Sequence, residues 1–339
     1  MSKNNKTFLK RIDYKGNPLD FISIVCRDYD IGSCISYEIV EMGYEDLNII
    51  IKTDKGKYFA KFFASFRDEK ECSRYVNIML KVLSAGVNHP KLYKSSQGYL
   101  HKIKIGKGVL RLCLMECIKG KTFYELGINP TIEEGKFLAN QAAIINRINI
   151  KPEFLYDQWA IVNFCKEYEE KRKYLSGEDK GLLDPLYNKF SSYNIGKLPY
   201  CFVHGDILKT NVIKTDEGKM YIIDFAVSNY YPRIIELAVL YCFFMDTDDF
   251  KKTDQMFEIV INEYQKNIKL TSSEKSEFPF FLKLAHAMHI LQANYQKEFK
   301  KNNSAENKYW LELGRKGLLH SGVYDDKNRH YDNMNYHSA

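Results

Sequence analysis

The chain has 339 residues, of which 45% are hydrophobic and 27% are charged, and its formal net charge is +7. These proportions exclude a disordered chain, and the length predicts two lobes rather than one core. Lysine and arginine are scattered among acidic residues, so the basic surplus does not predict a nucleic-acid partner.

The eight cysteines lie far apart, mostly inside apolar runs, and none forms a Cys-x-x-Cys pair. This spacing indicates neither a zinc motif nor a redox motif and is typical of a reducing compartment. The longest apolar run, Ile234–Met245, is broken by Glu236 and is too short to span a bilayer. The first residues lack the apolar segment of a secretory signal. We therefore expect a cytoplasmic protein with no membrane contact.

The first third of the chain predicts a small α+β lobe. A short helix is expected within 20–35, before the first strand. The segment Asp54-Lys55-Gly56 predicts the turn of a hairpin, because Asp and Gly accept the backbone angles of a tight turn. Apolar residues at helical spacing predict one further helix over 67–85. The five predicted strands of an antiparallel sheet cover 36–42, 47–53, 57–63, 98–105 and 108–115.

The rest of the chain predicts a larger, mainly helical lobe. Two short apolar strands, Tyr200–Val203 and 220–224, interrupt it. We expect a nucleotide-binding lobe over 1–116, a helical catalytic lobe over 117–320 and a polar tail over 321–339. The predicted helices cover 131–150, 157–175, 233–245, 250–266, 275–299 and 305–318.

The strongest local signal runs from His204-Gly205-Asp206 to Asn211 and on to Asp224. Phosphoryl transfer from ATP needs hard oxygen ligands for magnesium and a carboxylate that orients the attacking hydroxyl. Asp206 can be that carboxylate, and Asn211 and Asp224 can supply oxygen atoms to the metal. Each residue alone could be a turn or cap residue, but the whole set at this spacing favours the catalytic interpretation.

This segment resembles the catalytic segment of the aminoglycoside phosphotransferase and choline kinase family, whose fold is bilobal and protein-kinase-like. Gly205 stands where protein kinases have Arg, and Ala226 follows Asp224-Phe225 where they have Gly. The resemblance implies an ATP-dependent small-molecule kinase in which Asp206 is the catalytic base and Asn211 and Asp224 bind Mg²⁺. It also implies that His204 supports the loop and that Glu236 braces it.

The resemblance extends to the nucleotide site. Lys61 lies in an apolar strand, where an ammonium needs a counter-charge, and the family's equivalent lysine contacts phosphates and pairs with a helix glutamate. We expect that glutamate to be Glu71, with Glu69 as the competitor. The segment after the strand at 108–115 resembles the family's interlobe linker, which implies that adenine contacts Met115 and the main chain of Glu116 and Ile118.

One segment departs from the glycine-rich phosphate loop of protein kinases. Residues 41–48 read Glu-Met-Gly-Tyr-Glu-Asp-Leu-Asn and offer a single glycine. Fewer glycines allow fewer close backbone approaches to phosphate. The segment is similar to a loop of kinases that phosphorylate amino alcohols, hydroxylysine kinase among them.

The acceptor is not fixed by the sequence. Homoserine, choline or ethanolamine, hydroxylysine, methylthioribose and an aminoglycoside all fit a hydroxyl acceptor, and two other functions stay open, a protein Ser/Thr kinase and a non-catalytic nucleotide-binding module. Aromatic and acidic groups of the helical lobe would suit a cationic acceptor. The residues available for it are His286, His289, Gln292, Tyr295, Trp310 and Glu312.

Overall fold

The computed structural model describes residues 7–40, 45–106, 108–245 and 249–326. Two compact units account for the chain: residues 1–121 together with 213–225, and residues 122–212 together with 226–339. The sequence predicted one boundary after residue 116, whereas the segment 213–225 packs with the first unit. Residues 321–326, expected in a polar tail, instead continue a helix, and 327–339 lie outside the described residues.

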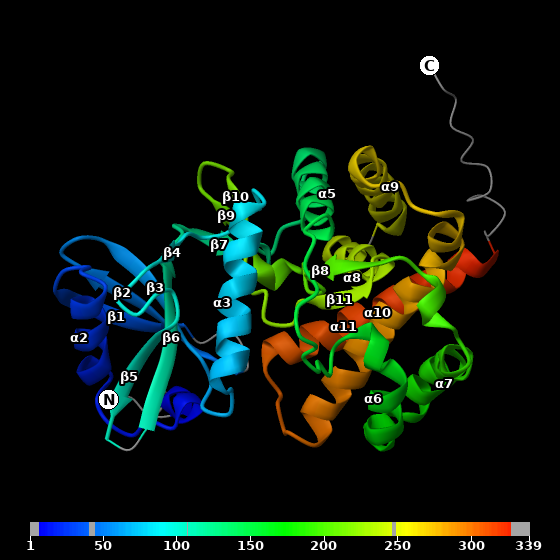
Figure 1. The fold of residues 1–339 in the computed structure, drawn as a ribbon. Helices are drawn as coiled ribbons and strands as arrows, with labels where there is room; N and C mark the ends of the chain where they lie inside the picture. The colour runs from blue at the N-terminus through cyan, green and yellow to red at the C-terminus, as the bar shows by residue number, and fades with distance from the viewer. Residues whose placement is uncertain (1–6, 41–44, 107, 246–248, 327–339) are drawn as a thin grey trace. The chain divides into compact units, whose positions relative to one another are not determined.

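The first unit contains an antiparallel sheet in the strand order β1-β2-β3-β6-β4, with β5 paired to β6 (Figure 1). The five expected strands are present, and a two-residue strand, β4, joins the edge of β6. The helix expected within 20–35 is α2, which begins two residues earlier and ends at Asp28, before the sheet. The elements are α2 (Pro18–Asp28), β1 (Cys34–Val40), β2 (Leu47–Thr53), β3 (Lys57–Phe62), α3 (Glu69–Ser84), β4 (Leu92–Tyr93), β5 (His101–Ile105) and β6 (Gly108–Glu116).

The two faces of this sheet differ because side chains alternate along each strand. One face packs against α2, and Phe62 of β3 contacts Phe21 of α2 edge to face with ring centroids 4.8 Å apart. Lys61, the neighbour of Phe62, is directed to the opposite face, on the side where α3 lies in Figure 1. The buried core of the α2 face includes Leu47, Ile49, Ile51, Ala60, Leu110, Leu112 and Leu114.

A second, three-stranded sheet in the order β10-β9-β7 is formed by β7 (Gly120–Thr122), β9 (Val212–Thr215) and β10 (Met220–Ile222). Most of it belongs to the first unit. The backbone N–H of Ile222 donates to the carbonyl of Asn88 at 2.8 Å, and the ring of Phe225 lies 5.6 Å from that of His89. These contacts attach the end of β10, and therefore Asp224, to the first unit.

The second unit is mainly helical, as predicted. Helix α8 (Ile234–Phe244) is apolar around most of its circumference and is buried, which is typical of a central core helix. The short strands β8 (Tyr200–Val203) and β11 (Asn229–Pro232) pair antiparallel beside it. The other helices are α4 (Phe123–Leu126), α5 (Ile132–Asn146), α6 (Phe164–Lys171), α7 (Gly177–Ser191), α9 (Phe250–Asn267), α10 (Ser272–Glu298) and α11 (Ala305–Asp326).

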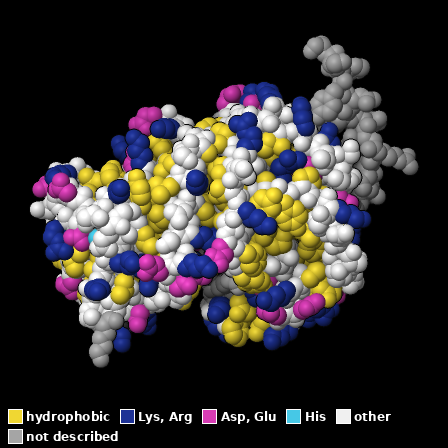
Figure 2. Space-filling model, viewed as in Figure 1, with side chains coloured by type: hydrophobic (Ala, Val, Ile, Leu, Met, Phe, Trp, Pro, Cys, Tyr) yellow, Lys and Arg dark blue, Asp and Glu magenta, His cyan; other side chains and the backbone are white. Residues whose placement is uncertain are grey.

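In the described ranges, no helix is long and apolar enough to cross a membrane. Basic side chains are interspersed with acidic and apolar ones over the face shown in Figure 2. This distribution agrees with the scattered charges of the sequence.

The packing of Phe62 predicts the result of a paired truncation. Phe62→Ala should lower the free energy of unfolding by about 3–5 kcal/mol, because the side chain is fully buried and its removal leaves a cavity. Phe66→Ala, at a side chain that is 68% exposed, should change it by less than about 0.5 kcal/mol. Urea unfolding of both variants measures the difference, and equal losses would contradict the described core.

Candidate active site

Lys61 is a buried ammonium surrounded by carboxylates of its own unit. It is 5% exposed, and its Nζ lies 3.2 Å from Asp46 Oδ2 and 3.3 Å from Asp224 Oδ1. The ring centroid of Tyr75 is 4.9 Å from the same nitrogen. Burial alone would lower the pKa of Lys61, but the negative charges of Asp224 and Asp46 outweigh burial and hold the pKa well above its ordinary value. Lys61 is therefore a permanent cation.

Asp46 is the counter-ion that the sequence did not identify. It lies immediately before β2 and is 7% exposed. Its Oδ1 accepts hydrogen bonds from the backbone N–H of Ala64 at 2.9 Å and from Arg67 Nε at 3.2 Å, while Oδ2 faces Lys61. Three donors therefore fix this carboxylate, and an acidic residue at the start of an apolar strand was the available signal.

The expected partner of Lys61, Glu71, does not fill this role in the structure. Asp68 caps the N-terminus of α3 by accepting from the backbone N–H of Glu71 at 2.8 Å, so Glu71 stays in the first turn of the helix. The competitor Glu69 pairs with Lys102 at 2.7 Å. One turn further along α3, Tyr75 occupies the position against Lys61. The prediction of a lysine–glutamate pair is therefore wrong for both glutamates, because the loop carboxylate of Asp46 is placed there instead.

Asp224 lies just after β10 and adopts a left-handed backbone conformation with φ of 65°. Asp tolerates this region better than most residues, although it still costs some free energy. Its Oδ1 accepts a hydrogen bond from the Tyr75 hydroxyl at 3.3 Å as well as from Lys61. The structure thus brings together Lys61 and Asp224, two predicted site residues that are 163 positions apart.

In the second unit, Asp206 and Asn211 lie on one loop after β8. Gly205 has φ of 78°, which a side chain would strain, and it turns the chain out of the strand. The Asn211 side-chain nitrogen donates to the Asp206 carbonyl at 3.0 Å and to its Oδ2 at 2.6 Å. The backbone N–H of Asp206 donates to His204 Nδ1 at 3.1 Å. Asn211 therefore holds the Asp206 carboxylate, and His204 holds the Asp206 backbone, so the predicted supporting role of His204 is confirmed.

Glu236 of α8 binds the backbone of this loop, as the family resemblance implied. It is fully buried and accepts from the backbone N–H groups of His204 at 2.6 Å and Gly205 at 3.3 Å, and from Asn146 Nδ2 at 3.2 Å. Burial raises the pKa of Glu236 to about 7, and the three hydrogen bonds oppose this shift only in part. The brace therefore titrates near neutrality.

The predicted adenine segment lies at the end of β6. Met115 is buried, and the backbone N–H of Glu116 donates to the carbonyl of Lys91 at 2.8 Å. Ile118 follows the strand and is half-buried. Of the predicted phosphate loop, residues 41–44 lie outside the described residues, so only its second half, which contains Asp46, is placed.

Several acceptor candidates of the helical unit are committed to internal contacts. Gln292 is fully buried and binds Lys171 Nζ at 2.7 Å and Glu167 Oε2 at 2.9 Å. The same Lys171 lies 4.3 Å from the ring centroid of Tyr295. Glu312 is exposed. The contacts of His286, His289 and Trp310 with one another are described below, so the location of the acceptor site stays a prediction.

These features define the class of small-molecule kinases with a protein-kinase-like fold. They are the antiparallel sheet of the first unit, the helical second unit, and the segments that carry Lys61, Asp206 and Asp224. Solved structures agree with this class. An amicoumacin kinase in complex with AMP-PNP and Ca²⁺ aligns over 97% of both chains with a TM-score of 0.67 and 16% identity. A microcompartment-associated aminopropanol kinase aligns over 90% of this chain and 98% of its own, with a TM-score of 0.64 and 12% identity.

The model of the phosphotransferase enzyme family matches residues 36–264. The chain belongs to this family, and it is a small-molecule kinase. Among curated proteins, the homoserine kinase of Zymomonas mobilis is 23% identical over 77% of this chain and 81% of its own. The homoserine kinase of Neisseria meningitidis is 23% identical over 74% of this chain and 80% of its own. The family resemblance seen in the sequence is therefore confirmed.

The raised pKa of Glu236 predicts a pH-dependent effect on stability. Because its folded pKa of about 7 lies above the ordinary 4.5, its ionised form is disfavoured in the folded state. Its contribution to stability is therefore fully present below about pH 4.5 and is lost as the pH rises to about 7. Glu236→Gln does not titrate, so its unfolding free energy relative to the wild type should rise by about 3 kcal/mol over this interval.

Urea unfolding at several pH values measures this difference. Glu312→Gln, at an exposed carboxylate of the same unit, is the matched control and should show no comparable trend. The Gln side chain loses one backbone hydrogen bond at every pH, so only the slope with pH is diagnostic. A wild-type-to-variant difference that is constant from pH 4.5 to 7.5 would contradict the assignment.

Proposed function

We propose that this protein transfers the γ-phosphate of ATP to the hydroxyl group of a small amino alcohol or amino acid alcohol, with Asp206 as the catalytic base. The observation that carries the proposal is the Asp206 carboxylate, fixed by Asn211 at 2.6 Å on a loop that Glu236 braces. In the transfer, the acceptor oxygen bonds to the γ-phosphorus, the bond from that phosphorus to the β–γ bridging oxygen breaks, and the hydroxyl proton passes to Asp206.

The residues present fit a hard divalent cation, which we propose to be Mg²⁺. Asn211 uses its side-chain nitrogen on Asp206, so its amide oxygen is the atom that would face a metal. Asp224 supplies a carboxylate. Oxygen ligands of this kind suit Mg²⁺, which supplies charge neutralisation at the phosphates when bound. Met115, Glu116 and Ile118 would bind the adenine.

Lys61 would bind the α- and β-phosphates through its ammonium. Asp46 and Tyr75 hold that ammonium at a fixed place on the sheet, and Asp224 neutralises part of its charge in the absence of nucleotide. This arrangement positions a cation without requiring a helix glutamate. In its proposed role, Asp46 acts through Lys61 and is therefore a positioning residue.

Homoserine is the acceptor that the sequence relatives favour. Homoserine carries both a primary hydroxyl and an amino group, and one structural neighbour is by name a kinase of another amino alcohol, aminopropanol. Amicoumacin is the second candidate, since the alignment to an amicoumacin kinase covers 97% of each chain. In this proposal the enzyme is cytoplasmic, where ATP is available. Its partners are ATP and the small-molecule acceptor, with no nucleic acid and no membrane.

Replacement of Asp206 tests this function. With Mg-ATP and a panel of homoserine, aminopropanol, choline, ethanolamine, hydroxylysine, methylthioribose and aminoglycosides, ADP release should depend on one class of acceptor. Asp206→Asn keeps the shape of the side chain but cannot accept the proton, so kcat should fall by about 10²–10⁴-fold. Asp216→Asn, at an exposed turn, is the control and should retain wild-type turnover.

Retention of wild-type kcat by Asp206→Asn would exclude the proposed mechanism. ATP binding without acceptor-dependent turnover would instead favour a non-catalytic nucleotide-binding module. Phosphorylation of a generic protein substrate in place of any small molecule would favour a protein Ser/Thr kinase.

A second variant pair separates Asp46 from Glu71. Asp46→Asn removes a charge from Lys61 and should raise the KM for ATP by about tenfold, equivalent to about 1.4 kcal/mol. Glu71→Gln should leave the KM for ATP within about twofold, because Glu71 does not contact Lys61. Circular dichroism checks that both variants fold, and Asp46→Glu should restore part of the loss. The reverse order of the two effects would assign the counter-ion to Glu71.

A further inference from the structure

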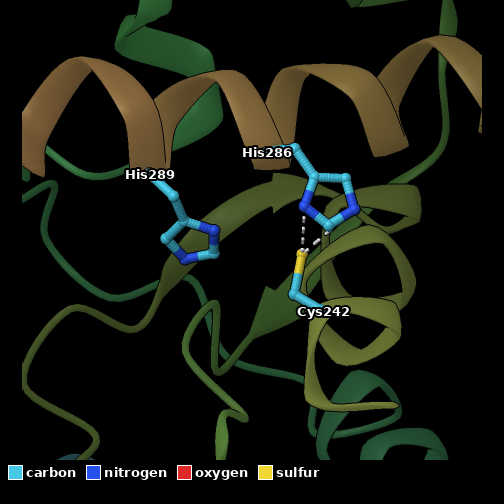
Figure 3. A group of neighbouring side chains, drawn as sticks. All are labelled: Cys242, His286 and His289. Carbon is cyan, nitrogen blue, oxygen red and sulfur yellow. Dashed lines mark hydrogen bonds between the residues drawn. The ribbon is translucent and has the colours of Figure 1, made fainter. Parts of the chain in front are cut away.

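Three buried side chains of the second unit converge at one point. Cys242 comes from α8, and His286 and His289 come from one face of α10 (Figure 3). One ligand-type atom of each residue lies within 4.8 Å of the other two. The Cys242 sulfur is 3.7 Å from His286 Nδ1 and 4.0 Å from its Nε2. A thiolate and an imidazole bound to one tetrahedral or trigonal metal ion have a similar separation.

A hydrogen-bonded core explains only part of this cluster. The Cys242 thiol lies 3.5 Å from the Ala238 carbonyl and also faces His286. Cys242 and His286 therefore have hydrogen-bond partners without a metal. His289 differs, because its Nδ1 is buried and has no hydrogen-bond partner. A buried polar atom without a hydrogen-bond partner destabilises the folded state. A missing ligand at this point would remove this destabilisation.

Helix α11 fixes both imidazole rings. Gly317 lies so close to His286 that a Cβ atom at position 317 would be 2.2 Å from the imidazole ring. The indole of Trp310 stacks on His289 with centroids 5.2 Å apart and ring planes 14° apart. Rings held in place by neighbouring groups need little reorganisation to bind an ion, which is how outer contacts support metal ligands.

The ionisation of these groups is compatible with metal binding. Burial lowers the pKa of His286 to about 3 and that of His289 to about 4, so both imidazoles are neutral at physiological pH, the form that binds metals. Burial raises the pKa of the Cys242 thiol, so an ion must displace its proton.

We propose that Cys242, His286 and His289 form a structural binding site for a thiophilic d¹⁰ metal ion, most suitably Cu(I). Thiolate and imidazole ligands select Cu(I) or Zn(II). A thiolate with Cu(I) is neutral, whereas the same thiolate with Zn(II) leaves a net positive charge among apolar side chains, where charge is costly. Three ligands suffice for Cu(I), and structural Zn(II) sites take four. The ion would join α8 to α10, independently of the kinase reaction.

The test uses the full chain and two ions. Wild-type protein is loaded anaerobically with Cu(I), challenged with a bathocuproine chelator and desalted, and its copper content is measured by mass spectrometry. We expect about one retained copper per chain and a higher thermal unfolding midpoint than for the metal-free protein. A parallel loading with Zn(II), with Co(II) as its spectroscopic substitute, distinguishes the two ions.

Matched variants exclude copper bound by other thiols. Cys242→Ser and His289→Gln should each retain at least tenfold less metal and show no thermal shift, while Cys26→Ser, at a buried cysteine of the first unit, should behave like the wild type. Circular dichroism checks folding, and His289→Gln keeps the test valid if Cys242→Ser misfolds. Zinc retention with the same dependence would support the site with the other ion. Absence of metal in the wild type, or retention in both variants equal to that of the wild type, would overturn the proposal.

Discussion

The first unit is organised by one buried ammonium group. A charged nitrogen inside a sheet is tolerated only when carboxylates lie beside it, since an unpaired buried charge costs several kcal/mol. The alternation of β3 directs Lys61 to the face opposite the α2 core, and two carboxylates meet it there. Asp46 immediately precedes β2, and Asp224 follows β10, 163 positions after Lys61 in the chain. The need to neutralise Lys61 therefore links distant segments of the sequence.

The second unit contains the converse arrangement, a buried carboxylate that binds backbone N–H groups. Glu236 of helix α8 is fully buried and holds the backbone at 204–205. The conformation of the loop that carries Asp206 therefore depends on a residue that does not itself carry out chemistry. Its raised pKa couples this support to pH near neutrality. Both units thus place a reactive group by means of hydrogen bonds or ion pairs to a buried polar side chain.

Local patterns were sufficient to predict much of this organisation. Two β-rich stretches on either side of the Asp54-Lys55-Gly56 turn predicted the β2–β3 hairpin. The turn is closed by a 2.8 Å hydrogen bond from Thr53 N to Gly56 O. The residues from His204 to Asp224 predicted the loop that carries Asp206, because all the residues of this pattern lie in one short stretch of the chain. Helix α7 was not predicted, since Gly177, Gly181 and an internal Pro185 are typical helix breakers.

Features that depend on the tertiary arrangement could not be predicted from the sequence. Glu71 and Asp46 are both acidic and both near Lys61 in sequence, and only the folded positions of α3 and β2 decide between them. The segment 213–225 joins the first unit although it follows the loop of the second. The Cys242 cluster joins residues 44 positions apart, so no spacing motif could reveal it.

Identification of the phosphorylated product tests the central claim most directly. Wild-type protein is incubated with Mg-ATP and homoserine, and the reaction is followed by phosphorus NMR until ATP is consumed. We expect a new phosphate monoester resonance from the phosphorylated acceptor hydroxyl, appearing in step with ADP. Formation of ADP and inorganic phosphate alone, with homoserine and with every other small-molecule acceptor tried, would contradict it.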